Sequence, residues 1–88
     1  MSISPRDEVF SALREELEDM NKLAAVQLMT ENAHFTHDMG LDSLDIVEFV
    51  ARAELRYRVH VPDDDFPGLD TVGKVIDYVL ARKADVQV

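Results

Sequence analysis

The chain has 88 residues, enough for one domain with a modest core but too few for a deep, walled active site. Its formal net charge of −9 argues against nucleic-acid binding and against an anionic membrane surface, because both rely on cationic residues. The absence of cysteine excludes disulfides and thiolate metal sites and fits a reducing compartment. No apolar run suits a signal peptide or a transmembrane helix, so we expect a cytoplasmic protein without membrane insertion.

The first predicted helix begins after Ser4, a good N-cap residue, with Pro5 at its first position and Asp7 placed to complete a capping box. Apolar residues then recur at three- and four-residue spacing and predict one buried stripe. The stripe consists of Val9, Phe10, Leu13, Leu17 and Met20.

Residues 21–34 show no sustained periodicity. The run 22–28 could extend the first helix or start a new turn, whereas Thr30 and Asn32 favour a loop. We therefore expect a long ordered loop that reaches Phe35, and an ordered loop of such length is often functional.

A second long helix is predicted from Ser43 to about Tyr57. Gly40 relieves the preceding turn, Asp42 is a favourable N-cap and Asp45 stands where a capping box needs an acid. The expected buried stripe of this helix consists of Leu44, Val47, Val50, Ala51 and Leu55.

The remaining chain predicts a short helix and a last long one. Residues 58–61 alternate polar and apolar side chains up to Pro62, and residues 63–65 cap a short turn or helix that ends near Gly68. Asp70 or Thr71 caps the last helix, whose inward face is Val72, Val75, Ile76, Val79 and Leu80. The whole chain 1–88 thus predicts one all-α domain, a small four-helix bundle in which three helices are long and the third along the chain is short. Its core is expected at about 4–83, with a frayed tail at 84–88.

Catalytic and metal-binding patterns are weak. His34, His37 and Asp38 could meet on one helical turn, but the segment does not predict a helix and no further ligand is evident, so hydrogen-bonded or solvated histidines are expected. The acids of residues 63–65 resemble a calcium loop only until Pro67 and Lys74 break the pattern. A serine hydrolase would need a nucleophile elbow that the chain lacks. We therefore expect a protein that is not an enzyme and binds no metal.

Ser43 is the residue with the most unusual position. At the start of a helix its hydroxyl should be exposed, and the free backbone N–H groups there favour a phosphate ester, although Asp42 and Asp45 offset part of this advantage. On position alone, a serine beside an aspartate N-cap is more commonly a capping residue.

The surrounding residues resemble the attachment signature of acyl carrier proteins: Phe35-x-x-Asp38-Met39-Gly40-Leu41-Asp42-Ser43-Leu44-Asp45-x-Val47-Glu48. The resemblance continues in residues 57–63 and again in residues 71–78, and the first helix is compatible with it. It implies an acyl-carrier-like fold and a 4′-phosphopantetheine arm on Ser43, flanked by Asp42. A separate phosphopantetheinyl transferase would attach this arm, using coenzyme A and magnesium.

The resemblance also implies a partner-facing helix surface. Its residues would be Leu44, Asp45, Ile46, Glu48 and Glu54. Val47 and Ile46 are candidates for contact with the arm or its cargo, although core packing is favoured for Val47. Partners would be acyl-transferring and chain-elongating or modifying enzymes with basic docking patches, visited by a monomeric carrier.

Two features bear on the pathway. Arg52, Arg56 and Arg58 depart from the uniformly acidic surface of many fatty-acid carriers and leave partner choice open, and the sequence before Ser43 lacks the second glycine typical of peptidyl carriers. Fatty-acid or polyketide-type acyl chains are thus the expected cargo. An unmodified helical adaptor that keeps the fold, and a peptidyl or aminoacyl carrier, stay open as alternatives.

Overall fold

The computed structural model describes residues 3–86, with side chains described up to residue 82. The helices are α1 (Pro5–Asp19), α2 (Leu23–Gln27), α3 (Ser43–Tyr57), the 3₁₀ helix η1 (Phe66–Gly68) and α4 (Val72–Val86). Within the described residues there is no strand, only an isolated bridge between His34 and Thr71. The all-α prediction is confirmed.

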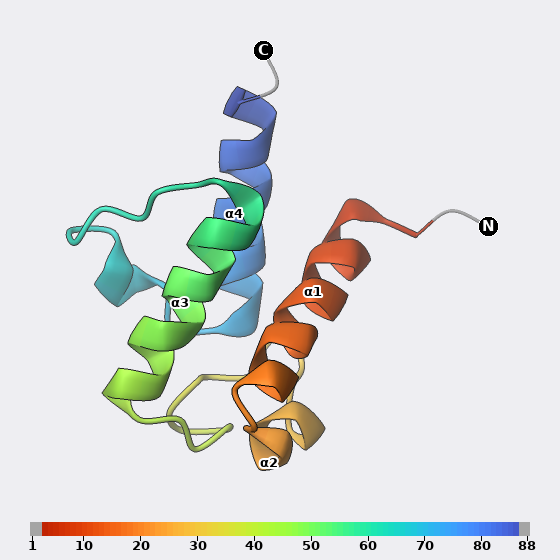
Figure 1. Ribbon diagram of the computed structural model, residues 1–88, viewed down its shortest axis with the longest axis vertical. Coiled ribbons are helices and arrows are strands. Elements are labelled where there is room, and N and C mark those ends of the chain that lie inside the picture. The colour runs from red at the N-terminus through yellow and green to blue at the C-terminus, as the bar shows by residue number, and fades with distance from the viewer. Residues whose placement is uncertain (1–2, 87–88) are drawn as a thin grey trace.

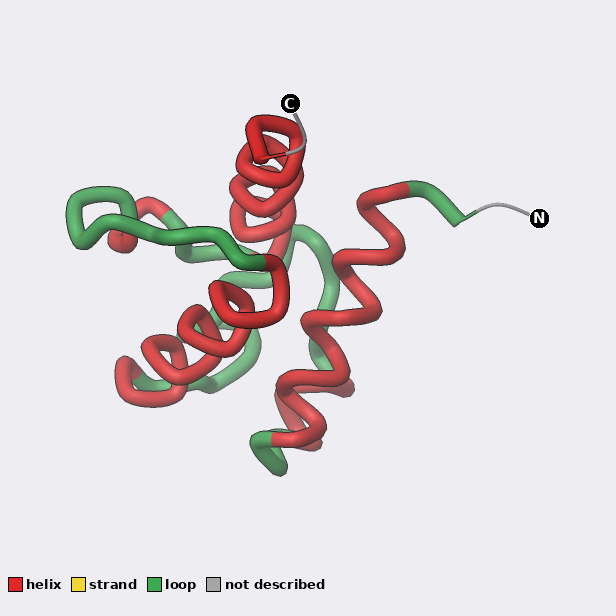
Figure 2. The backbone as a smooth tube through the Cα atoms, turned by 45° about the horizontal axis from the view of Figure 1, so that its top comes forward, coloured by secondary structure: helices red, strands yellow, loops and turns green. Residues whose placement is uncertain are grey.

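The three long helices enclose the core, and two connections cross between their ends (Figures 1 and 2). α1 packs against each of the other α-helices, α2, α3 and α4. α4 continues to Val86, beyond the end expected near residue 83, and the last two residues of the predicted tail lie outside the described residues.

The predicted start and buried stripe of α1 are confirmed. Ser4 Oγ accepts a hydrogen bond from the Asp7 N–H at 3.1 Å, which satisfies one of the free donors at the helix start. Val9, Leu13 and Leu17 are buried, and Phe10 and Met20 pack partly buried against the same core.

The segment 23–27 forms the short helix α2, so the expectation of a loop through these residues is wrong. α1 ends in a Schellman motif, in which Asn21 adopts a left-handed φ of 61°. The Lys22 N–H donates to the Leu17 carbonyl at 2.9 Å and the Asn21 N–H donates to the Glu18 carbonyl at 2.9 Å. This sharp end turns the chain into α2, where burial of Ala25 compensates for the helix's short length.

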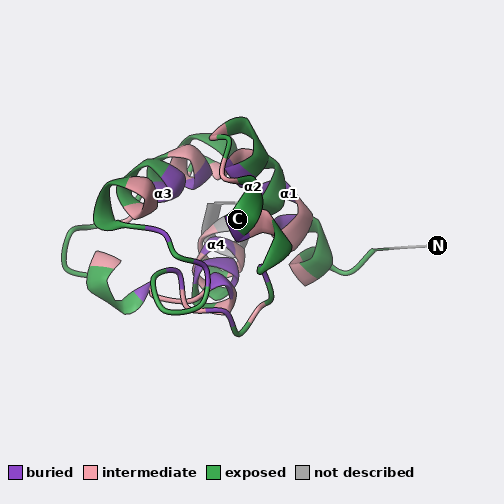
Figure 3. Cartoon of the chain, turned by 90° about the horizontal axis from the view of Figure 1, so that it is seen from below, coloured by how far each residue is buried: buried purple, intermediate pink, exposed green. Residues whose placement is uncertain are grey.

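The buried face of α3 differs from the predicted one. Phe49, Val50 and Ala53 are buried, and the Phe49 ring packs edge-on against Phe35 with centroids 5.4 Å apart. Of the predicted stripe only Val50 is buried; its other members, Leu44, Val47, Ala51 and Leu55, are exposed. The prediction failed because α3 carries two apolar stripes with helical spacing, and only tertiary packing selects one (Figure 3).

The connection between α2 and α3 is fixed to the start of α4. The Phe35 N–H donates to the Asp70 carbonyl at 3.0 Å, and the Gly73 N–H donates to the Glu31 carbonyl at 2.7 Å. Gly73 permits this approach because a Cβ there would lie 2.9 Å from the Glu31 oxygen. Thr71 is the residue that caps α4, since its Oγ1 accepts the Lys74 N–H at 3.3 Å.

Both arginines of α3, Arg52 and Arg56, join it to α1. Arg56 lies 3.0 Å from Glu15 and 2.9 Å from Glu16, and Arg52 lies 3.4 Å from Glu16 and 3.1 Å from Glu48. These ion pairs give Arg52 and Arg56 a structural role within the bundle. Arg58 instead ends α3 with a left-handed φ of 55°.

The packing predicts opposite consequences for two truncations in α3. Phe49→Ala removes a fully buried ring and should lower the free energy of unfolding by about 3–5 kcal/mol, whereas Leu55→Ala should change it by less than about 0.5 kcal/mol. Urea denaturation of both variants measures the difference. A large loss for Leu55→Ala with little loss for Phe49→Ala would show that α3 packs through its other stripe.

Candidate functional site

Ser43 is the first residue of α3 and is exposed, as predicted. The preceding turn is anchored on both sides of Gly40 by the buried side chains of Met39 and Leu41, and Gly40 itself adopts a positive φ of 74°. The chain therefore leaves the core at Leu41 and presents the next residues to solvent.

Asp42 and Asp45 form the complete capping box that the sequence predicted. Asp42 Oδ1 accepts the Asp45 N–H at 2.8 Å, and Asp45 Oδ2 accepts the Asp42 N–H at 3.2 Å. This reciprocal pair fixes the first turn of α3 and the backbone of Ser43 within it. It also leaves the N–H groups of Ser43 and Leu44 without an acceptor among the described residues.

Lys22 lies beside the start of α3, although no sequence pattern pointed to it. Its Nζ lies 2.9 Å from Asp45 Oδ1, so a cation from the α1–α2 connection sits beside the first turn of α3. The hydrogen bond from Lys22 lowers the pKa of Asp45, whose side chain is only 18% exposed, and the same bond raises the pKa of Lys22. The two residues are far apart in sequence, and no local pattern joins them.

Among the described residues, no base is hydrogen-bonded to the Ser43 hydroxyl. Asp42 and Asp45 are both engaged with backbone N–H groups, and no hydrogen bond of the Ser43 hydroxyl is found within the described residues. His34 is occupied elsewhere, since its Nδ1 accepts the N–H groups of Thr36 and His37. In the described part of the chain, no group of three or more His, Asp or Glu side chains is arranged to hold a metal ion.

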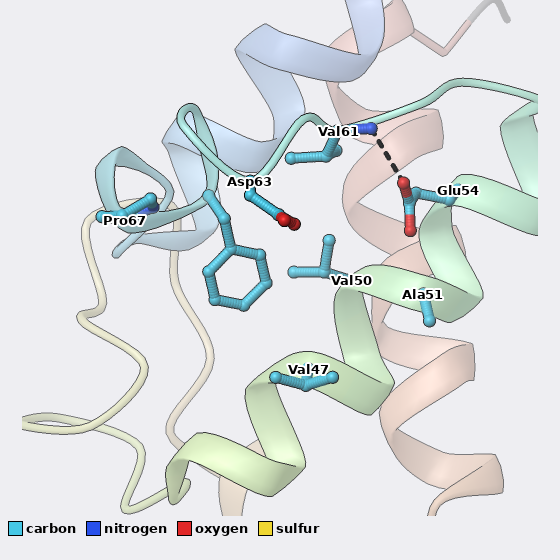
Figure 4. Close-up of a pocket in the computed structure, with 8 residues that line it drawn as sticks. Val47, Val50, Ala51, Glu54, Val61, Asp63 and Pro67 are labelled. Carbon is cyan, nitrogen blue, oxygen red and sulfur yellow. Dashed lines mark hydrogen bonds between the residues drawn. The ribbon is translucent and has the colours of Figure 1, made fainter.

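A cavity of about 390 Å³ lies between α3 and the connection that leads through η1 (Figure 4). Its lining is mostly apolar and consists of Val47, Val50, Ala51, Glu54, Val61, Asp63, Phe66 and Pro67. Val47, for which core packing was expected, is half-exposed and lines this cavity, one turn along α3 from Ser43. That expectation is wrong for the same reason as the predicted stripe of α3.

Glu54 holds the wall of this cavity. Its Oε2 accepts the Val61 N–H at 2.8 Å, drawn as the dashed line in Figure 4, and lies 3.5 Å from His60 Nδ1. The side chain is only 27% exposed. Glu54, which the resemblance assigned to the partner-facing surface, therefore also holds the connection after α3 against that helix.

The remaining predicted surface residues lie at different depths. Leu44 is 79% exposed and Glu48 is 54% exposed, although Glu48 pairs with Arg52. Ile46 is half-buried against the core. The structure brings Ser43, Leu44 and Glu48 to the open surface of α3 and leaves Asp45 and Ile46 more enclosed.

A family model described as a phosphopantetheine attachment site matches residues 11–79. The acyl carrier protein of Acidothermus cellulolyticus is 34% identical over 84% of this chain and 87% of its own length. The chain belongs to the acyl carrier protein family.

Two further acyl carrier proteins are similar over less of their own length. The mitochondrial acyl carrier protein of Neurospora crassa is 39% identical over 88% of this chain, which spans 58% of that protein. The meromycolate extension acyl carrier protein of Mycolicibacterium smegmatis is 34% identical over 84% of this chain and 74% of its own length. Membership of the family implies a covalently attached 4′-phosphopantetheine.

The residues around Ser43 fit such a group. An exposed hydroxyl offers the ester oxygen, and the two free N–H groups of Ser43 and Leu44 point toward the end of α3 where a phosphate would lie. Lys22 supplies a nearby positive charge. Across the described residues no helix is long and apolar enough to cross a membrane.

Proposed function

We propose that this chain is an acyl carrier protein in which Ser43 bears the 4′-phosphopantetheine arm. The observation that supports this most strongly is the exposed Ser43 hydroxyl on the first turn of α3, which the Asp42–Asp45 capping box holds rigid. A rigid, exposed hydroxyl without its own base suits modification by a separate enzyme.

In the modification step, Ser43 Oγ attacks the phosphorus next to the pantetheine part of coenzyme A. A new oxygen–phosphorus bond forms, the nucleotide part of coenzyme A leaves with the bonding electrons, and the hydroxyl proton passes to a base of the transferase. Once attached, the arm supplies a terminal thiol that holds acyl groups as thioesters, so a chain without cysteine takes part in thioester chemistry.

The cavity beside α3 suits the apolar part of an acyl chain. Val47, Val50 and Phe66 give it an apolar lining. Val47 is also exposed to solvent and therefore lies at the edge of the cavity. The cargo class that fits is the hydrocarbon chain of fatty-acid or polyketide-type synthesis.

The docking surface consists of Leu44, Val47 and Glu48 beside Ser43. Two exposed apolar side chains next to a carboxylate suit a partner enzyme with an apolar contact framed by basic residues. Asp45, Ile46 and Glu54 support this surface from behind through the capping box, the core and the cavity wall. The carrier presents its cargo and leaves the chemistry to its partners, as a monomer in the cytoplasm.

The arm site is tested by measuring the intact mass after incubation with coenzyme A, magnesium and a broad-specificity phosphopantetheinyl transferase. Wild type should gain the mass of one phosphopantetheine unit and Ser43→Ala should gain none, because the only proposed acceptor oxygen is removed. Ser11→Ala, in α1, is the matched control and should load like wild type. Loading of Ser43→Ala, or a wild type that stays unloaded while a control carrier is modified, would refute the proposal.

The docking surface predicts a charge effect on the same transfer. Glu48→Lys should lower the kcat/KM of arm transfer on the order of tenfold, because it places a cation beside a basic partner. Glu18→Lys makes the same change on the exposed side of α1 and should leave the rate within about twofold of wild type. Equal rates for the two variants would remove Glu48 from the docking surface.

A further inference from the structure

The backbone of Lys22 is fixed by the end of α1. The Schellman motif at the end of α1 places its backbone N–H on the Leu17 carbonyl, and the left-handed Asn21 sets the direction in which the chain leaves. From there the side chain extends to the first turn of α3 and reaches Asp45, two residues after Ser43. Lys22 therefore joins the α1–α2 connection to the first turn of α3.

The electrostatic surroundings of Lys22 are strongly negative. Asp45 is its direct partner, and Asp42 and Glu48 also raise its pKa through the field of their charges. Attachment of the arm adds a phosphodiester anion to Ser43, among these carboxylates. The free N–H groups of Ser43 and Leu44 favour this anion, whereas the neighbouring carboxylates repel it, and a cation beside it offsets that repulsion.

No other described cation is paired with this turn. Arg52 is paired with Glu16 and Glu48, one turn further along α3 or on α1, and Lys74 is paired with Asp70. Among the lysines and arginines whose side chains are described, Lys22 is the one with an ion pair to residues 43–46.

We propose that Lys22 is a positioning residue for the arm and that its ammonium group binds the phosphodiester on Ser43 in the loaded protein. This inference rests on the proposed attachment at Ser43. In the unloaded protein Lys22 binds Asp45 Oδ1, while Asp45 Oδ2 stays with the Asp42 N–H. On loading, the flexible lysine side chain turns from Asp45 toward the phosphate oxygens, and the capping box stays closed. Lys22 thereby orients the root of the arm and offsets its charge.

The test is a thermodynamic cycle that compares unloaded and loaded protein, each as wild type and as Lys22→Met. Lys22 contacts Asp45 in the unloaded protein and the phosphodiester in the loaded one. The comparison therefore reports how much more Lys22 stabilises the loaded protein than the unloaded one. Loading should leave the Tm of wild type nearly unchanged and should lower that of Lys22→Met by about 2–5 °C at low salt. Lys74→Met removes a lysine from a comparable ion pair with Asp70 and is the matched control, for which loading should act as in wild type.

A second readout does not depend on stability. The ³¹P resonance of the phosphodiester should shift between loaded wild type and loaded Lys22→Gln, and Lys22→Arg should restore the wild-type position. Identical loading effects on Tm in all variants, together with an unmoved ³¹P resonance, would overturn the role of Lys22. A failure of wild type to load on Ser43 would instead refute the proposed function, which the mass of the starting material shows directly.

Discussion

The reciprocal capping box between Asp42 and Asp45 is the interaction on which the rest of the site depends. It decides where α3 begins, and thereby which residue stands at the boundary between a buried turn and an open helix surface. Met39 and Leu41 hold that turn in the core, and Gly40 supplies the backbone conformation that the turn requires. Ser43 is exposed because Met39 and Leu41 anchor the preceding turn in the core, while Asp42 and Asp45 cap the helix start around it.

Many carboxylates of the chain form ion pairs or hydrogen bonds within the bundle, so the surface is not uniformly negative. Glu15 and Glu16 join α1 to the arginines of α3, and Glu54 closes the connection beside the cavity. Asp45 is divided between a backbone N–H and Lys22. Only some of the acidic side chains are left for partners, so we place the docking surface at the exposed start of α3. The arginines that left partner choice open in the sequence are partly neutralised by α1, so they alter the surface less than their number suggests.

The sequence predicted those features that depend on neighbouring residues. The caps of α1 and α3, the single apolar stripes of α1 and α4, and the position of Ser43 all follow from spacing of a few residues. The buried face of α3 could not be predicted in this way, because its two apolar stripes satisfy the same periodicity and contacts with Phe35 and α1 select between them. The short helix α2 depends on burial of Ala25, and the Lys22–Asp45 pair joins distant segments, so both required the three-dimensional structure.

We place the root of the arm at the first turn of α3, in a bundle that does not rearrange to receive it. Backbone amide NMR spectra of the loaded and unloaded protein test this most directly. We expect the largest shifts on the amides of residues 42–45 and smaller ones at Lys22 and along the cavity, while the amides of α1 around Leu13 keep their positions. Shifts spread evenly over all the helices, or centred away from the start of α3, would contradict it.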